Sequence, residues 1–362
     1  MANDNPLLDL DGLPRFAHIE PGQVTPALDA ILDEARATVE ARLSRDPGRG
    51  WDDAVGPLET MEARLKRFWS PVAHLNAVAD SAALREAYNA GLGRLTSYQT
   101  SYAQDERVYR AYRAVAEGPA FASLNEARKK VVTNALRDMR LSGVALEAGP
   151  KARFKAIQEK LSELTSRFEQ NVLDATDAFS LVVEDEARLQ GIPASVLAQA
   201  RSEAQRRGFA GFLLTLQAPS YVPIMTYAQD RALRRQLYEA YVTRASEAGD
   251  GRYDNTALAH EILALRREAA TLLDFPHYAD YSLATKMARD ATEVEEFLSD
   301  LARRARPAAL RELADLATLA QADDLSLEAW DTAYYSERLK ERRYQFSEED
   351  LRPYFQIGRA SL

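Results

Sequence analysis

Apolar residues recur every three or four positions along most of the chain, which is the spacing of one face of an α-helix. The clearest stripes are Leu58, Met61, Leu65 and Phe68; Leu84, Tyr88, Leu92 and Leu95; Phe154, Ile157, Leu161, Leu164, Phe168 and Val172; and Leu233, Leu237, Tyr238 and Tyr241. Each stripe predicts a helix with one buried face, so we expect helices to dominate and these residues to form the core.

The middle of the chain has a different pattern. Residues 179–183 (FSLVV) and 212–216 (FLLTL) are short runs of apolar, mostly β-branched or aromatic residues bounded by charge, Gly or Pro, which is typical of strands. Residues 221–227 are a third candidate, but Pro223 cannot donate a ladder hydrogen bond and favours an edge strand or an extended loop. We therefore predict a mainly α fold, an elongated multi-helix lobe with one small β-sheet inserted at about residues 179–227.

No low-complexity linker divides the 362 residues, although Gly149 and Pro150 mark a possible joint. We expect a first helical part over residues 1–150. A second helical part over residues 151–355 carries the β insertion and belongs to the same lobe.

Charge and cysteine content narrow the possible partners and surroundings. Lys and Arg number 46 against 55 Asp and Glu, a net charge of -9, which gives nucleic acid and anionic lipid no general attraction. No apolar run approaches the ~20 residues of a membrane helix, and the acidic start of the chain is unlike a secretory signal. The chain has 0 cysteines, which fits the cytoplasm. We expect a cytoplasmic protein that binds neither nucleic acid nor membrane.

The four histidines offer little chemistry. His18, His74 and His277 are expected to be structural or capping groups. His260-Glu261 begins like the zinc-peptidase motif H-E-x-x-H, but Ala264 stands where the second histidine would lie. Glu268 is eight residues after His260, about 12 Å along a helix at ~1.5 Å per residue, too far to share one ion. The residues therefore predict no catalytic residue and no metal ligand.

Other motifs are incomplete. Gly91-Leu-Gly93 resembles part of a dinucleotide fingerprint, but it lies inside a helical pattern and follows no strand. The sequence contains neither a Walker loop nor a G-x-S-x-G nucleophile elbow. Its basic clusters are expected to be solvated faces.

Several longer segments, taken in order, resemble the thimet oligopeptidase family of zinc metallopeptidases, in particular its bacterial oligopeptidase A-like branch. They are Phe68–Asn76, Asn134–Asp138 with Leu141–Gly143, Asn171–Thr176, Ser220–Tyr227, Ser282–Met287, Trp330–Ser336 and Leu351–Phe355. The resemblance runs from about Asn5 to Phe355. It implies a mostly helical lobe that faces a second lobe across a deep channel for short unfolded peptides.

The resemblance also implies hydrolysis of internal peptide bonds by a zinc-bound water. In the family, the zinc ligands and the His and Tyr residues that hold the reacting carbonyl lie farther along the chain than this sequence extends. We therefore expect the catalytic zinc domain to be absent, no zinc to be bound by this chain, and the chain to be inactive alone. Residues 356–362 depart from the family pattern as a divergent tail, consistent with a truncation, a frameshift, a split gene or a true short protein.

Expectations about partners follow from the same resemblance. Short peptides should bind weakly because one channel wall is missing, with Tyr334 and Tyr335 as candidate substrate-channel residues and ordinary core packing as their alternative role. Apolar surface near residues 292–355 should meet the missing catalytic lobe or drive self-association. The alternative function is a standalone peptide-binding or scaffold protein derived from a peptidase lobe.

Overall fold

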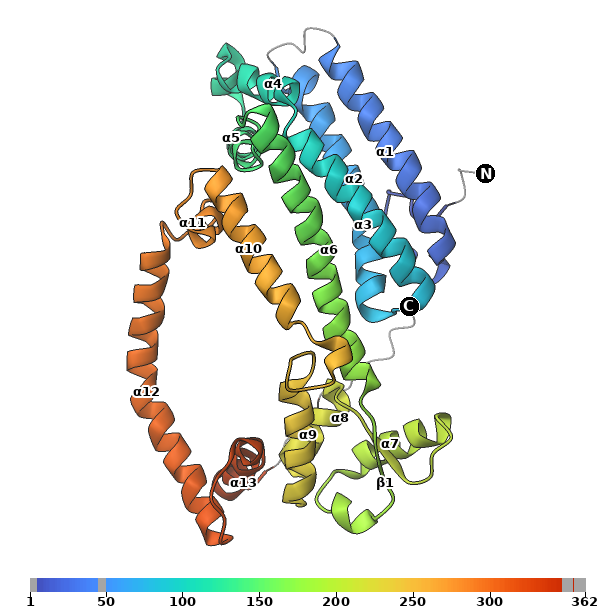
Figure 1. The fold of residues 1–362 in the computed structure, drawn as a ribbon, viewed down its shortest axis with the longest axis vertical. Coiled ribbons are helices and arrows are strands. Elements are labelled where there is room, and N and C mark those ends of the chain that lie inside the picture. Colours follow the sequence, from blue (N-terminus) through green and yellow to red (C-terminus); the bar gives the residue numbers. More distant parts are fainter. Residues whose placement is uncertain (1–4, 45–49, 347–353, 355–362) are drawn as a thin grey trace. The chain divides into compact units, whose positions relative to one another are not determined.

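The computed structural model describes residues 5–44, 50–346 and 354, which contain thirteen α-helices and two short β-strands (Figure 1). The chain divides into two compact units. Unit 1 comprises Met1–Arg167 and His260–Ala291, and unit 2 comprises Phe168–Ala259 and Thr292–Leu362. Gly149 and Pro150 lie in the first turn of helix α6 (Ala148–Ala178). The boundary between the two units lies later in the same helix, after Arg167.

Unit 1 is a bundle of helices joined by short connections. Its elements are the 3₁₀ turns η2 (Phe16–His18) and η4 (Pro119–Ser123), the π-helical turn η3 (Trp51–Val55), helices α1 (Pro21–Leu43), α2 (Gly56–Val78), α3 (Ala82–Ala103), α4 (Glu106–Ala116), α5 (Glu126–Leu141) and α11 (Tyr278–Leu283), the first part of α6 and most of α10 (Thr256–Leu272). Helix α1 begins with a reciprocal capping box between Glu20 and Gln23. Pro21 is the first residue of the helix, a position where the missing N–H of proline costs no helical hydrogen bond.

The predicted stripes form the core of unit 1. Leu58, Met61, Leu65 and Phe68 of α2 are all buried against apolar residues of α1, α3 and α4. Trp69 stacks on Tyr88 with ring centroids 5.2 Å apart, which joins α2 to α3. A Cβ atom on Gly91 would lie 3.0 Å from the Trp69 ring, so glycine lets the two helices approach. Gly91 therefore lies inside a helix, as predicted, and serves its packing.

Unit 2 contains the predicted small sheet among helices. Its elements are the end of α6, strands β1 (Leu181–Val183) and β2 (Phe212–Leu214), the 3₁₀ turns η5 (Glu186–Leu189), η6 (Gly251–Tyr253) and η7 (Ala329–Asp331), and helices α7 (Ala194–Arg206), α8 (Ala218–Tyr227), α9 (Arg231–Thr243), α12 (Ala291–Ala322) and α13 (Thr332–Tyr344), together with the start of α10. The strands pair antiparallel, with Val183 opposite Phe212 and Leu181 opposite Leu214. The mainly α fold with one inserted sheet is thus confirmed.

The third strand candidate was wrong, because residues 218–227 form helix α8. Tyr221 packs against the apolar core of unit 2, and Ile224, Met225 and Ala228 are buried in it, a spacing of three and four that matches a helix face. Pro219 lies in the first turn, where proline is tolerated. Pro223 costs α8 one backbone hydrogen bond, and burial of this face outweighs that loss.

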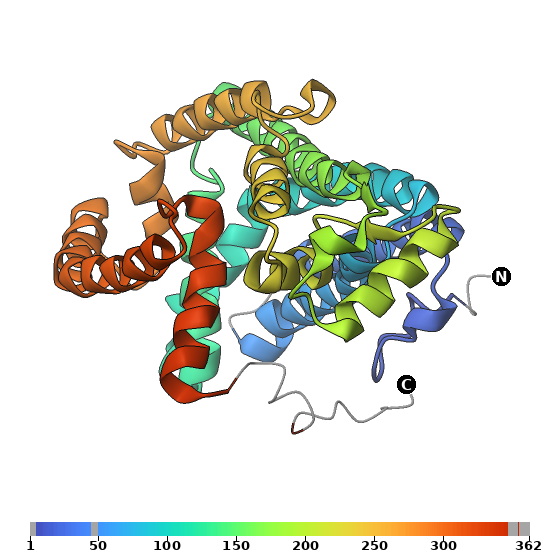
Figure 2. The same ribbon diagram turned by 90° about the horizontal axis from the view of Figure 1, so that it is seen from below.

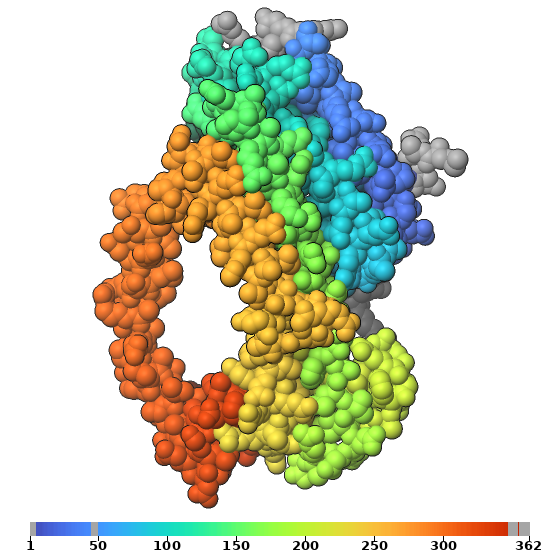
Figure 3. Space-filling model, viewed as in Figure 1, coloured from blue at the N-terminus to red at the C-terminus, as the bar shows by residue number. Residues whose placement is uncertain are grey.

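Helix α12 is buried near its C-terminal end, whereas the apolar residues of its earlier turns are exposed. Leu316, Leu319 and Ala320 pack with Tyr334 and Tyr335 of α13 in a small apolar cluster, and Figure 2 shows α13 in red beside the end of α12. Figure 3 shows the orange atoms of α12 open to solvent on the face in view. Neither α12 nor another helix in the described ranges is long and apolar enough to cross a membrane.

Candidate functional site

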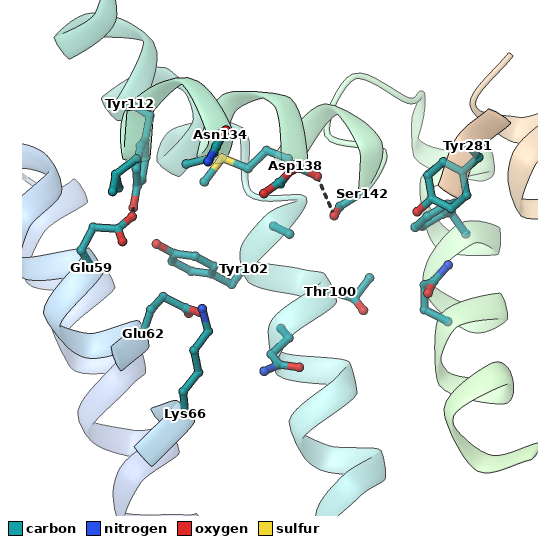
Figure 4. A pocket seen from close by; sticks show the side chains of 17 residues that line it. Glu59, Glu62, Lys66, Thr100, Tyr102, Tyr112, Asn134, Asp138, Ser142 and Tyr281 are labelled. Carbon is teal, nitrogen blue, oxygen red and sulfur yellow. Dashed lines mark hydrogen bonds between the residues drawn. The ribbon is translucent and has the colours of Figure 1, made fainter. Parts of the chain in front are cut away.

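A cavity of about 470 Å³ lies within unit 1 and combines acidic, amide and aromatic side chains (Figure 4). We call it the Glu62 cavity. Its walls come from α2, α3, α4, α5, α6 and α11, and its polar and aromatic lining residues are Glu59, Glu62, Lys66, Gln99, Thr100, Tyr102, Tyr112, Asn134, Asp138, Ser142, Phe154, Gln158 and Tyr281. A volume in this range suits a small organic ligand.

One end of the Glu62 cavity is acidic. Glu59 and Glu62 lie one turn apart on α2, and the Tyr102 ring projects from α3 toward them (Figure 4). The Tyr112 hydroxyl donates to Glu59 Oε1 at 2.7 Å. Burial raises the pKa of the Glu62 carboxyl above its ordinary value; the Lys66 charge offsets part of this rise and the Glu59 charge adds to it. A cationic group at this end would therefore be stabilised.

Two buried polar atoms at this end make no hydrogen bond within the described residues: Glu62 Oε1 and the Tyr102 hydroxyl oxygen. The Tyr112 hydroxyl interacts with that of Tyr102 and donates its own proton to Glu59, so it donates none to the Tyr102 oxygen. Burial, followed by the neighbouring Glu62 charge, raises the pKa of Tyr102, which keeps the phenol protonated at neutral pH. The acidic end thus presents an unmatched carboxylate oxygen beside an unmatched hydroxyl.

The four histidines are scattered. His74 contacts Phe16 with ring centroids 5.3 Å apart, and His18 ends the turn η2. His277 precedes α11 as its N-cap residue but makes no side-chain cap hydrogen bond, so the predicted capping role of its side chain is not observed. His260 is exposed on α10. Glu268, on the same helix, accepts two hydrogen bonds from Arg153 at 2.6 and 2.7 Å, so its carboxylate is already occupied.

Tyr334 and Tyr335 lie in the apolar cluster between α12 and α13, with 8% and 2% of their surface exposed. The Arg234 guanidinium lies 4.2 Å from the centre of the Tyr334 ring. The Tyr335 hydroxyl donates to Asp323 Oδ2 at 3.0 Å, and burial together with this bond raises the pKa of Tyr335 to about 12. These contacts are those of core residues, and lining of a peptide channel by either ring stays a prediction.

A buried ionic cluster lies next to these tyrosines in unit 2. Asp331 is fully buried and accepts hydrogen bonds from Arg234 Nη2 at 2.7 Å and from Arg231 Nη2 at 2.7 Å. Arg234, whose side chain is 1% exposed, also donates to the Ala228 carbonyl at 2.6 Å. We call Asp331, Arg231 and Arg234 the Asp331 cluster. It joins α9 to η7 and α13.

Comparison with known proteins identifies the family. The profile described as Neurolysin/Thimet oligopeptidase, N-terminal domain, matches residues 27–151, and Peptidase family M3 matches residues 224–361. Oligopeptidase A of Salmonella typhimurium is 46% identical over 360 residues, which cover 98% of this chain. The chain belongs to peptidase family M3.

This M3 chain spans about half the length of the curated relatives it matches. The aligned region covers 53% of the Salmonella protein and 53% of oligopeptidase A from Escherichia coli, which is also 46% identical. A probable cytosolic oligopeptidase A from Arabidopsis thaliana is 36% identical over 366 residues, covering 98% of this chain and 52% of that protein. The similarity to the oligopeptidase A-like branch is therefore confirmed.

The described residues of this M3 chain do not fit the zinc ion that the family resemblance implies. No group of three or more His, Asp or Glu side chains within the described ranges is placed to hold a metal. All four histidines of the sequence lie in these ranges, and Ala264 occupies the position one turn after His260. No step of metal chemistry can be derived from these residues.

Reasoning from the sequence missed both the Glu62 cavity and the Asp331 cluster. The residues Glu59 and Glu62 read as an ordinary polar face beside a predicted apolar stripe. Arg231 and Asp331 are separated by 100 positions, so only the folded chain brings them together. The one sequence signal for the Asp331 cluster was Asp331 itself, a charged residue next to Trp330 in a segment that resembles the family.

Proposed function

We propose that these 362 residues form the non-catalytic lobe of a zinc metallo-oligopeptidase and supply one wall of its peptide channel. The alignment to oligopeptidase A over 98% of the chain, with only 53% of the Salmonella protein covered, carries the proposal. The full family enzyme would hydrolyse internal bonds of short peptides with zinc. In this proposal, the chain acts in the cytoplasm and contributes shape and surface, whereas the chemistry belongs to the other half.

Peptide hydrolysis should be absent from a protein made of these residues alone. A zinc peptidase depends on a metal-bound water, because the ion lowers the pKa of that water to about 7, far below its value in bulk water. Such a site requires three protein ligands that converge, and the described residues offer no such group. We therefore expect this chain to bind no catalytic zinc.

The exposed stripe of α12 supports a covering partner. Phe297, Leu298 and Leu301 are 66%, 54% and 53% exposed, and they follow a spacing of one helix turn. Leu310 and Leu313 farther along α12 are about half exposed as well. An apolar surface of this kind marks an interaction site, and in our proposal the catalytic lobe covers it. In the absence of that lobe, copies of the chain should associate through it.

Peptides should bind this lobe only weakly. Good sites bury most of a ligand, and a single channel wall leaves a peptide largely solvated. We expect dissociation constants no tighter than about 0.1 mM, or roughly −5 kcal/mol. Tyr334 and Tyr335 are our candidates for this wall.

A chimeric protein tests the proposal against the alternative of a standalone peptide-binding or scaffold protein. In the chimera, this chain replaces the aligned portion of Salmonella oligopeptidase A. We expect the folded chimera to cleave a quenched fluorescent peptide and to lose this activity to a chelator. A chimera that folds and binds zinc but cleaves nothing would favour the standalone role.

A further inference from the structure

The acidic end of the Glu62 cavity is incomplete without a ligand. Glu62 Oε1 and the Tyr102 hydroxyl are buried, and neither makes a hydrogen bond within the described residues. A buried polar atom without a partner costs about 1–3 kcal/mol. The two side chains come from different helices, α2 and α3, and lie at the same end of the cavity (Figure 4).

The charges around the cavity select a cation. Its lining carries three carboxylates, those of Glu59, Glu62 and Asp138, and one cation, Lys66. Lys66 lies near Glu62 and offsets part of its charge, and Asp138 is paired with Arg137 at 2.8 Å, which leaves the lining with an excess of negative charge. Glu59 and Glu62 therefore dominate the buried end. The aromatic rings of Tyr102 and Tyr112 line the same end, and aromatic faces attract a desolvated cation further.

An ammonium group matches this end better than a metal ion or a guanidinium does. It offers three N–H donors from one point, so it can reach Glu62 and Glu59 while it donates to the Tyr102 oxygen. The two carboxylates alone are fewer than the ligands that a metal site needs, and the described residues hold no group of three. A planar guanidinium prefers a bidentate contact with both oxygens of one carboxylate, and Glu59 already accepts a hydrogen bond from the Tyr112 hydroxyl.

The opposite walls favour an uncharged polar remainder. Asn134 and Gln158 contribute side-chain amides, and both residues are partly buried in the cavity lining. Amide groups can donate and accept, so they would pair with carbonyl and N–H groups of a ligand. Phe154, Met139 and Val131 add apolar contacts between the two ends.

We propose that the Glu62 cavity binds a small ligand that carries a primary ammonium group, with Glu62 and Tyr102 as its direct contacts. The ammonium group has two natural sources, the free amino terminus of a short peptide and a free aliphatic amine. Asn134 and Gln158 favour the amino terminus, because only that source also carries amide groups. The site lies wholly within unit 1 and requires no peptidase activity, so it stands apart from the proposed function.

Saturation-transfer NMR titrations of the full chain at pH 7 test this site with three probes. Alanyl-alaninamide carries an ammonium and amides, N-acetyl-alanyl-alaninamide carries amides alone, and putrescine carries ammonium groups alone. We expect alanyl-alaninamide to bind at least tenfold more tightly than its acetylated form. Binding of putrescine as tight as that of alanyl-alaninamide would assign the site to free amines, and weaker binding would assign it to amino termini.

Variants connect the binding to the cavity. Glu62→Gln keeps the side-chain shape and removes the charge, and Tyr102→Phe removes only the hydroxyl. We expect Glu62→Gln to weaken alanyl-alaninamide at least tenfold and Tyr102→Phe to weaken it severalfold. Glu86→Gln, an exposed glutamate on α3, is the matched control and should bind like the original chain. Equal binding of both dipeptides, unchanged binding by Glu62→Gln, or no binding of any probe at 10 mM by the folded chain would overturn the proposal.

Discussion

Arg234 and Asp331 are 97 residues apart in the sequence and form a buried ion pair, with Arg234 Nη2 2.7 Å from Asp331 Oδ1. Arg231 donates to the same carboxylate and to the Ser326 carbonyl, both at 2.7 Å. The pair therefore fixes η7 and α13 to α9 within unit 2. Because both side chains are removed from water, loss of Asp331 leaves the Arg234 charge buried without a counter-charge.

Asp331→Asn should strongly destabilise unit 2. The substitution keeps the shape of the side chain but leaves Arg234 buried without a counter-charge, at an expected cost of about 3–5 kcal/mol. Urea unfolding, followed by circular dichroism, measures the change. Asp300→Asn, which removes a carboxylate paired with Arg303 and Arg304 on the exposed side of α12, should cost less than about 1 kcal/mol. Similar losses in the two variants would contradict the importance of the buried pair.

The Asp331 cluster should make the stability of unit 2 sensitive to acid. Burial raises the pKa of Asp331, but hydrogen bonds from Arg231 and Arg234 outweigh burial and lower it below the ordinary 3.8. A depressed folded pKa means that the stabilisation is present above pH 3.8 and is lost as pH falls through the folded value. The stability difference between the original chain and Asp331→Asn should therefore shrink as pH falls from 4 toward 2. A constant difference over that window would refute this linkage.

Glu62 should have the opposite pH dependence. Burial raises its folded pKa above the ordinary 4.5, so the folded state binds the proton more tightly and stability falls as pH rises from 4.5 through the folded value. Glu62→Gln should therefore be more stable than the original chain at pH 7, by up to about 1 kcal/mol, and nearly equal to it at pH 4. Thermal unfolding at the two pH values measures this, and a destabilised variant at pH 7 would argue for an internal partner of Glu62.

The exposed stripe of α12 should drive self-association. Leu298→Glu places a charge in the stripe and should lower the average mass measured by light scattering at high protein concentration. Ser299→Glu, at the neighbouring exposed position, adds the same charge outside the apolar residues and should leave the mass unchanged. A monomeric original chain, or equal effects of the two variants, would show that copies do not meet through this face.

A buried leucine on the same helix gives the contrasting case. Leu319 packs against α13 in the cluster that includes Tyr334 and Tyr335. Leu319→Ala should cost about 2–5 kcal/mol through lost burial and a cavity, without reducing association of the folded chain. Chemical unfolding and light scattering together separate the two effects. A stability loss below 1 kcal/mol would show that the end of α12 is not anchored by this cluster.

The sequence predicted those features that depend on local periodicity. Leu58 and Phe68 are buried, as the helical spacing predicted, and the two short apolar runs form paired strands, as their bounded pattern predicted. The prediction for residues 221–227 was wrong because Pro223, which by sequence favours a sheet edge, lies inside helix α8, where the burial of Ile224 and Met225 outweighs its missing hydrogen bond. The resemblance to known segments, rather than the spacing, identified the family.

Long-range features could not be predicted in this way. The Glu62 cavity needs walls from six helices, and no spacing rule connects Glu62 on α2 with Tyr281 on α11. The tail residues 356–362 and Phe355 lie outside the described residues. Tyr334 and Tyr335 were predicted as candidate substrate-channel residues, but the sequence could not show that Arg234 lies over the Tyr334 ring or that the Tyr335 hydroxyl donates to Asp323.

Hydrolysis of a quenched fluorescent peptide by the pure 362-residue protein, supplied with zinc, tests the central claim most directly. Salmonella oligopeptidase A serves as the active reference under the same conditions. We predict no cleavage above the buffer rate, since no metal-holding group exists among the described residues. Cleavage by the pure chain that disappears on addition of a chelator would contradict the assignment of this chain as a non-catalytic lobe.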